Sequence, residues 1–261
     1  MRLPAITVVI PTHDRRERLK DCLDSVAGQT FDDFEVVVVD DASTDGTRAL
    51  FAGYARSRPG WRLHRHRRRL GAAAARNTGL RLARAPLIAF LDSDDLWHPR
   101  KLETQLRFLR SRGATAVYCD FDLVHAGRVV ERGCIRSQKL WWYWRDPLDR
   151  FTGLRSPRTS TVLASRRALL SVGGFDRNFR YLCDDSDLWY RLCEKYGAGS
   201  FLFQKKSLAS YRLHDGQLIG ANAGLARSFP RTKRGPRTAR ERETLLDIAC
   251  LEFKVRNGRQ A

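Results

Sequence analysis

Short runs of apolar, often β-branched residues alternate with amphipathic segments through the N-terminal part of the chain. Each run is long enough for one buried strand and too short for a buried helix. These runs cover residues 5–10, 34–39 and 87–91, and a further strand is expected at 61–66. Apolar residues at helical spacing predict the intervening helices, over 15–27, from a capping Ser43 or Thr44 to 56, and over 76–84.

Strands and helices in this order, joined by short links, predict a mainly parallel sheet with right-handed crossovers. In such sheets, ligands bind in a crevice at the carboxyl ends of the strands. Acidic residues follow three of the predicted strands, namely Asp14, Asp40 with Asp41, and Asp92 to Asp95. We therefore expect these carboxylates to converge on one crevice.

The run Asp92-Ser93-Asp94-Asp95 places three carboxylates within four residues. Carboxylates this close repel each other unless a cation lies among them, and oxygen ligands suit Mg²⁺ or Mn²⁺. The alternative is an acidic turn in which Asp94 or Asp95 caps the next helix. Because other carboxylates are expected at the same edge of the sheet, the sequence favours a metal site.

A nucleotide would use these polar groups in distinct ways. A carboxylate after the second strand can accept the imide N–H of uracil or thymine, or the N1–H of guanine. Arg76, at the start of its predicted helix, can meet a diphosphate or a base edge. The basic run at 64–69 either adds positive potential nearby or forms a solvated loop.

The second half of the chain carries a different order of elements. Its pattern predicts helices over 101–110 and 165–171, and strands over 114–124, 128–134 and 159–164, with a turn at 126–127. The aromatic run Leu140-Trp141-Trp142-Tyr143-Trp144-Arg145 could stack on a sugar, lie at a membrane surface or pack in the core.

Four motifs resemble family 2 glycosyltransferases of the GT-A fold. They are Pro11 to Arg15, Val39 to Thr47, Ala75 to Gly79 and Leu91 to Asp95. The family usually has an aromatic residue and Asn where this chain has His13 and Asp14. The resemblance implies a GT-A-like (Rossmann-like) α/β fold, a nucleotide-sugar donor, Mn²⁺ or Mg²⁺ at the D-x-D motif, and inversion at the anomeric carbon.

Carried over by position, the resemblance implies that Asp41 contacts the base, Arg76 the nucleotide, Asp92 the ribose side and Asp94 the metal. The same motifs place further residues at the nucleotide-sugar site, namely Pro11, Thr12, Asp14, Arg15 and Ser93.

Two later segments extend the resemblance. The run from Cys183 to Leu192 is similar to the family's acidic pair before a D-L-W-x-R-L helix, with Asp184 in place of the usual Glu. A helix dipole keeps such a carboxylate ionised, so Asp185, or else Asp184, is expected as the general base; the alternative is a helix cap. Tyr211 to His214 resembles the family's Y-R-x-H, in which His214 would ligate the metal, touch the diphosphate or be structural.

Charge leaves two other classes open. The formal net charge of +19 attracts polyanions, so a non-enzymatic nucleic-acid-binding protein is an alternative, although nucleic acid is not the expected partner. A nucleotidyltransferase would share the strand-end carboxylates, but Pro11-Thr12-His13-Asp14 lacks the glycines of a phosphate loop. The expected partners are a nucleotide-sugar donor, with a UDP-sugar favoured, and a glycan, glycolipid or lipid-linked saccharide acceptor.

Composition also indicates the cellular location and the division of the chain into domains. The six cysteines form no C-x-x-C pair and no apolar run is long enough to span a bilayer, which predicts a cytoplasmic protein. We expect one GT-A-like domain over 1–222 and a basic C-terminal extension over 223–261 that ends in an amphipathic helix. That helix would pack on the core, pair with another chain or lie on an anionic membrane. In the last case, the protein would be peripheral to the inner face of the cell membrane.

Overall fold

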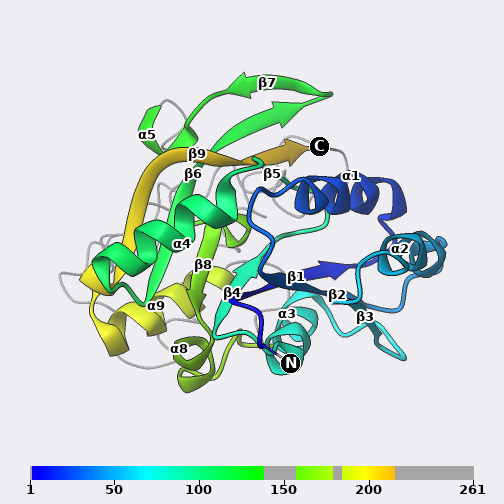
Figure 1. Cartoon of the computed structure of the whole chain (residues 1–261), viewed down its shortest axis with the longest axis horizontal. Helices are drawn as coiled ribbons and strands as arrows, with labels where there is room; N and C mark the ends of the chain where they lie inside the picture. Colours follow the sequence, from blue (N-terminus) through cyan, green and yellow to red (C-terminus); the bar gives the residue numbers. More distant parts are fainter. Residues whose placement is uncertain (1, 138–156, 179–183, 215–261) are drawn as a thin grey trace, which may run out of the picture.

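The computed structural model describes residues 2–137, 157–178 and 184–214. Its N-terminal half is a run of parallel strands separated by helices (Figure 1). The strands are β1 (Ile6–Thr12), β2 (Phe34–Asp40), β3 (Trp61–Arg65) and β4 (Leu87–Phe90). The helices between them are α1 (Arg16–Ala27), α2 (Thr47–Ala55) and α3 (Ala72–Leu82). In the view of Figure 1, α1 lies above and α3 below strands β1 and β2.

The second half continues the same sheet with mixed directions. Its strands are β5 (Leu96–Trp97), β6 (Ala116–His125), β7 (Arg128–Glu131), β8 (Val162–Ser165) and β9 (Phe201–Leu213). The described residues form one nine-stranded sheet in the order β3-β2-β1-β4-β8-β6-β9-β5, with β7 paired to β6. Strand β8 runs antiparallel to β4 and β6, whereas β6 and β9 run parallel.

The remaining helices flank this second half. They are α4 (Lys101–Arg112), α5 (Cys134–Ser137), α8 (Arg166–Ser171) and α9 (Asp184–Tyr196), with short 3₁₀ turns η1 (Thr159–Thr161) and η2 (Ala198–Ser200). Trp189 of α9 is buried in the core, and its indole N–H donates to the carbonyl of Pro157 at 3.0 Å. The start of α9 is thereby fixed beside η1.

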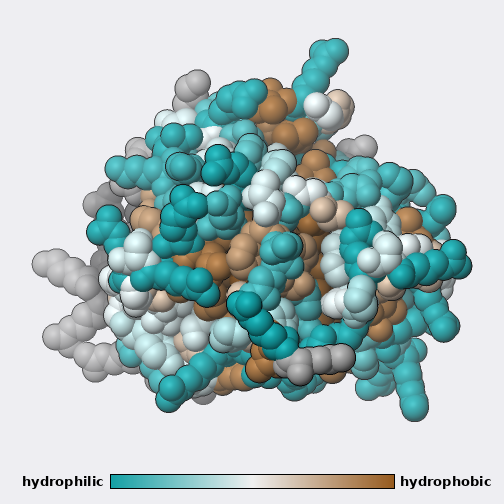
Figure 2. Space-filling view, in the orientation of Figure 1, coloured by the Kyte–Doolittle hydropathy of each residue, from teal (hydrophilic) through white to brown (hydrophobic). Residues whose placement is uncertain are grey.

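The central strands are buried on both faces, as their continuous apolar runs predict. Helix α3 packs closely on β1 because residue 79 is glycine: a Cβ at Gly79 would lie 2.2 Å from Cγ1 of Val9. Hydrophilic residues cover most of the face seen in Figure 2, and a small apolar patch lies over β7, where Val129 and Val130 are exposed.

The α/β class with a mainly parallel, helix-flanked sheet is confirmed, and the predicted strands and helices of the N-terminal half are all present. Three local predictions are wrong. Helix α2 begins after Gly46, without a side-chain cap from Ser43 or Thr44. Helix α3 begins at Ala72, so Arg76 lies one turn inside it. Residues 159–161 form a 3₁₀ turn before β8 and not a strand.

Within the described ranges, no helix is both long and apolar enough to cross a membrane. The aromatic run at 140–145 and the expected extension at 223–261 lie outside the residues that the structure describes.

Candidate active site

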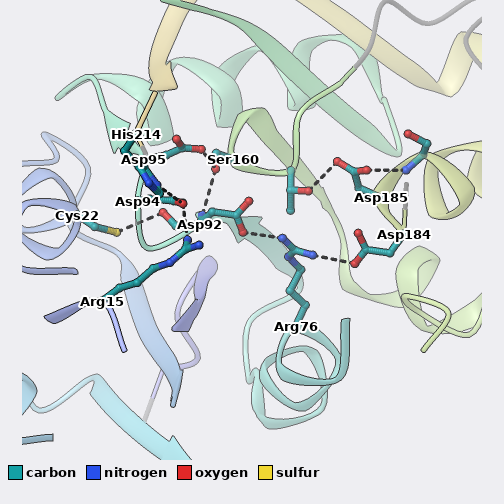
Figure 3. Close-up of polar contacts among 12 residues, drawn as sticks. Arg15, Cys22, Arg76, Asp92, Asp94, Asp95, Ser160, Asp184, Asp185 and His214 are labelled. Atoms are coloured by element: carbon teal, nitrogen blue, oxygen red, sulfur yellow. Dashed lines mark hydrogen bonds and ion pairs between the residues drawn. The ribbon is translucent and has the colours of Figure 1, made fainter. Parts of the chain in front are cut away.

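The acidic loop Asp92 to Asp95 follows β4 at the carboxyl edge of the sheet (Figure 3). The hydroxyl of Ser160, from the η1 turn, forms hydrogen bonds with both ends of this loop. The Ser160 hydroxyl accepts from the backbone N–H of Asp92 at 3.1 Å and donates to Oδ2 of Asp95 at 2.6 Å. The backbone N–H of Arg212 donates to Oδ1 of Asp95 at 3.2 Å. Asp95 is thus a buried structural anchor that shapes the loop.

Arg76 joins the acidic loop to the start of α9. Its Nη2 donates to Oδ1 of Asp92 at 2.7 Å and its Nη1 to Oδ2 of Asp184 at 2.8 Å, as Figure 3 shows. The guanidinium also lies 5.3 Å from the ring centroid of Phe175. One buried cation therefore links carboxylates that are far apart in the sequence.

Burial and charge act in opposite directions on this group. Burial alone would lower the pKa of Arg76, but the carboxylates of Asp92 and Asp184 outweigh it and raise that pKa, so the guanidinium stays charged. Burial raises the pKa of Asp184 to about 6 despite the opposing effect of Arg76. The pKa of Asp92 is also raised by burial, against the same cation. An uncharged form of Asp184 is thus accessible in mildly acidic solution.

Asp94 lies between two basic side chains. Its Oδ2 contacts the guanidinium of Arg15 and, at 3.0 Å, the Nε2 of His214 (Figure 3). Burial would raise the pKa of Asp94, but the His214 hydrogen bond and the Arg15 charge outweigh it and hold that pKa below its usual value. The site therefore keeps an ionised carboxylate where a cation is expected.

The carboxylate of Asp94 is of the type that binds Mn²⁺ or Mg²⁺, and the imidazole of His214 is a common ligand of transition metals. Among the described residues, no group of three or more His, Cys, Asp or Glu side chains is arranged to hold a metal. Sites of this kind commonly take one or two protein ligands and complete the shell with substrate phosphates and water. The pair fits such a substrate-completed site, provided that Arg15 gives up its contact with Asp94.

Asp185 accepts its hydrogen bonds from groups other than Arg76. The Thr159 hydroxyl donates to its Oδ2 at 2.9 Å, and the backbone N–H of Ser186 donates to its Oδ1 at 2.9 Å. Both donors are neutral, and both oxygens retain further lone pairs. Asp185 and Asp184 thus differ in their partners although they are neighbours in the first turn of α9.

The carboxyl end of β1 carries Pro11, Thr12 and Asp14. The Thr12 hydroxyl is buried, and no described residue hydrogen-bonds to it. Asp14, at a positive φ of 46°, accepts from the backbone N–H of Thr44 at 2.7 Å. Its own N–H donates to the Ser43 hydroxyl at 3.0 Å. Asp14 therefore ties two loops together.

Asp41 is buried directly after β2, and its carboxylate already accepts several hydrogen bonds. The donors are His66 Nδ1 at 2.7 Å, the N–H of Leu70 at 2.9 Å and the N–H of Gly71 at 2.7 Å. A base contact to Asp41 would share or replace one of these bonds. Ser93 is buried within the acidic loop.

The structure thus brings Arg15, Arg76, Asp92, Asp94, His214 and the Asp184–Asp185 pair into one connected cluster, while Asp14 and Asp41 hold loops at its edge. Sequence reasoning missed Thr159, Ser160 and the anchoring role of Asp95. The Thr-Ser-Thr run precedes apolar residues and has the pattern of a strand, so the turn that presents its hydroxyls left no separate signal.

A curled α/β sheet of this topology, with its acidic loops at the carboxyl edge, defines a glycosyltransferase of the GT-A type. Residues 7–173 match the family model described as glycosyl transferase family 2, and the chain belongs to that family.

Curated relatives include the putative teichuronic acid biosynthesis glycosyltransferase TuaG of Bacillus subtilis. It is 36% identical over 46% of this chain and 48% of its own length. The Escherichia coli UDP-Glc:alpha-D-GlcNAc-diphosphoundecaprenol beta-1,3-glucosyltransferase WfgD is 32% identical over 48% of this chain and 49% of its own length. An uncharacterised Rickettsia prowazekii glycosyltransferase is 24% identical over 82% of this chain and 65% of its own length. The chain therefore spans between about half and two thirds of these relatives.

Two solved structures share the fold. The mannosyltransferase PcManGT of Pyrobaculum calidifontis, in complex with GDP-Man and Mn²⁺, has a TM-score of 0.67 at 22% identity and covers 97% of this chain and 70% of its own. S. aureus TarS in complex with UDP-GlcNAc has a TM-score of 0.61 at 20% identity, covering 82% of this chain and 60% of its own.

Proposed function

We propose that the protein transfers a sugar, with inversion, from a nucleotide-diphosphate sugar to a hydroxyl acceptor. The observation that carries this proposal is the Arg76 bridge between Asp92 and Asp184. It joins the strand-end loop, where a donor would bind, to the helix start, where an acceptor would be activated. A purely structural cluster has little use for several buried carboxylates around one cation, because burying charge is costly.

On the donor side, Arg15 and Arg76 would supply positive charge for a diphosphate. Asp92 can accept a hydrogen bond from a hydroxyl of the ribose. The Thr12 hydroxyl, buried at the same edge of the sheet, has no partner among the residues that the structure describes, which suits a polar contact with the nucleotide. Pro11, Ser93 and Asp14 would shape this pocket. Asp41 would contact the base directly, by accepting a hydrogen bond from it in addition to those it accepts from the protein. Alternatively, it would fix the position of a loop that contacts the base.

Asp94 and His214 would hold Mn²⁺ or Mg²⁺. When bound, the metal supplies positive charge that stabilises the leaving diphosphate. In the ligand-free protein, the guanidinium of Arg15 forms an ion pair with Asp94, at the position where the metal would bind. Arg15 is thereby placed to turn toward phosphate oxygens.

Asp185 is the proposed general base, and Asp184 is the alternative. Asp184 gives one oxygen to Arg76, which fixes it as a charge partner of the donor side. Within the described ranges, the donors to Asp185 are neutral, so its lone pairs can take the proton of an acceptor hydroxyl. The Thr159 hydroxyl orients Asp185 for this role.

The names of relatives guide the choice of substrates. TuaG and WfgD are named for teichuronic acid and for a diphosphoundecaprenol-linked sugar, and the two fold neighbours hold UDP-GlcNAc and GDP-Man. We therefore favour a UDP-sugar as donor and a glycan, glycolipid or lipid-linked saccharide as acceptor. Such an acceptor fits a cytoplasmic protein in peripheral contact with the membrane.

The domain division follows the same proposal. Residues 1–222 would form the catalytic domain, and the basic segment 223–261 would recruit it to an anionic surface. This segment lies outside the described residues, so its role is inferred from sequence alone.

A thermal-shift panel tests the function. A ligand that binds only the native state raises the unfolding midpoint by mass action. UDP-, GDP- and dTDP-sugars are each added to the full chain with and without Mn²⁺. We expect one nucleotide class to raise the midpoint, and Mn²⁺ to enlarge that rise. If no nucleotide sugar shifts the midpoint under either condition, the proposed function is wrong.

A further inference from the structure

The loop between β3 and α3 is held at both ends by one carboxylate. Asp41 accepts from the ring of His66 where the loop begins, and from the N–H groups of Leu70 and Gly71 where it ends. The ring of His66 also lies 3.0 Å from the hydroxyl of Thr78 on α3. Gly71 has a φ of 91°, which favours glycine and lets both N–H groups turn toward Asp41. The backbone between these anchors is therefore preorganised.

Three consecutive arginines, Arg67 to Arg69, lie between the anchors, and all three are exposed. None of them makes an ion pair or a side-chain hydrogen bond within the part of the chain that the structure describes. The arginines of the preceding strand differ: Arg62 pairs with Glu35, and Arg65 lies 3.4 Å from Asp40. The loop thus holds three uncompensated positive charges side by side.

Leu70 follows the arginines and is 38% exposed. Guanidinium groups bind phosphate oxygens in bidentate fashion, and an adjacent exposed apolar side chain gains by entering hydrocarbon. A nucleic-acid surface would use the arginines but not the leucine. Single-strand binding would also call for aromatic side chains to stack on bases, and residues 67–71 contain none.

We propose that the segment Arg67 to Leu70, the cationic arch, docks the protein on an anionic phospholipid bilayer. Strand β3 lies at one edge of the sheet, and the arch follows its carboxyl end (Figure 1). The acidic loop after β4 lies at the carboxyl end of a parallel strand in the same sheet. Docking through the arch would therefore turn that edge of the sheet toward the membrane.

Co-sedimentation of the full chain with vesicles tests this proposal. The vesicles are phosphatidylcholine with or without phosphatidylglycerol. The variant replaces Arg67, Arg68 and Arg69 with Gln, and a control with equal charge loss replaces Arg107, Arg110 and Arg112 of α4 with Gln. Residues 215–261 are kept in every protein, so their contribution cancels in the comparison.

Each basic residue near an anionic surface adds roughly a fivefold gain in binding, so loss of the arch should lower the partition coefficient about a hundredfold. The α4 control should fall much less, and added salt should remove most of the difference. Leu70→Ala should cause a smaller loss that persists in salt. The thermal midpoints of all variants serve as the check on folding.

Three results would overturn the proposal. The first is failure of the wild-type chain to bind phosphatidylglycerol vesicles. The second is an equal loss of binding in the arch variant and in the α4 control. The third is loss of RNA or DNA binding in the arch variant, by gel mobility, with vesicle binding retained. None of these results bears on whether nucleotide sugars bind, so failure of the arch and failure of the proposed function are separable.

Discussion

Neighbouring carboxylates can hold different chemical roles when their partners differ. Asp184 forms an ion pair with Arg76, whereas Asp185 accepts hydrogen bonds from a threonine hydroxyl and a backbone N–H. The two residues stand one position apart, and the partners that distinguish them, Arg76 and Thr159, are distant in sequence. Single substitutions at the pair therefore test the assignment.

Asp185→Asn should lower the turnover of the donor identified by the thermal-shift panel by ~10²–10⁴. Asparagine keeps the shape and can still accept from Thr159, so donor binding and stability should change little. Turnover and donor affinity are measured side by side for Asp185→Asn and Asp184→Asn. Near wild-type turnover in Asp185→Asn, or a loss of affinity in step with turnover, would remove Asp185 from the role of base.

Asp184 should also leave a signature in stability. Its pKa is raised from 3.8 in an unperturbed chain to about 6 in the fold, mainly by burial. The folded state then binds more protons than the unfolded state between these values, so this group's contribution to stability falls as pH rises through that window. We expect the thermal midpoint of wild type, relative to Asp184→Asn, to fall between about pH 4 and pH 6. A constant difference across that window would show that Asp184 titrates normally.

At the scale of elements, the sheet is organised by close contact of α3 with β1. Gly79 permits that contact, because a Cβ there would meet a side chain of β1 that is itself fully buried. The contact also sets the position of Arg76, which lies on the same helix. Packing and site geometry are therefore linked through one helix.

Gly79→Ala should destabilise the fold by about 1–3 kcal/mol, since the added methyl group forces Val9 or the helix to move. Gly53→Ala is the matched control, because a Cβ at this helical position meets nothing within 4 Å. It should be neutral or stabilising by up to ~1 kcal/mol. Chemical denaturation of both variants measures the two effects, and equal stability of the pair would contradict the packing argument.

The elements that sequence predicted best are those with strong local patterns. The apolar runs of β1, β2 and β4 and the spacing of apolar residues in α1 and α4 identify those segments directly. The antiparallel entry of β8 beside β4 has no such local signal, because a short apolar strand can pair in either direction. The Thr159–Thr161 turn was missed because its hydroxyl groups matter through contacts distant in sequence.

The same limit applies to the site. The acidic loop, Arg76 and the α9 carboxylates could be chosen from motifs and their strand-end positions. The saturation of Asp41 by backbone N–H groups could not, because those donors come from residues 70 and 71 through the path of a loop. The ion pair between Arg76 and Asp184 likewise could not be predicted, because it depends on how α3 and α9 are placed relative to each other in the fold.

At the scale of the whole molecule, Asp92, Asp94 and Asp184 form buried or half-buried ion pairs at the carboxyl edge of the sheet, while the net charge is strongly positive. Buried carboxylates bind cationic partners such as Arg15 and Arg76, and the excess arginine lies elsewhere, including the cationic arch. Under the proposals above, this division would give one molecule a site for a nucleotide and a metal together with a surface for an anionic partner. Salt should therefore weaken surface binding far more than donor binding.

The most direct test of the account is release of nucleoside diphosphate from the donor by the full chain. It is measured with and without Mn²⁺ for wild type, Asp94→Ala and Glu17→Ala, an exposed control on α1. We predict Mn²⁺-dependent release by wild type and by Glu17→Ala, and its loss in Asp94→Ala, with a cooperative thermal transition of the ligand-free variant as the check that it remains folded. Full metal-dependent release by Asp94→Ala would contradict the proposed metal and donor site.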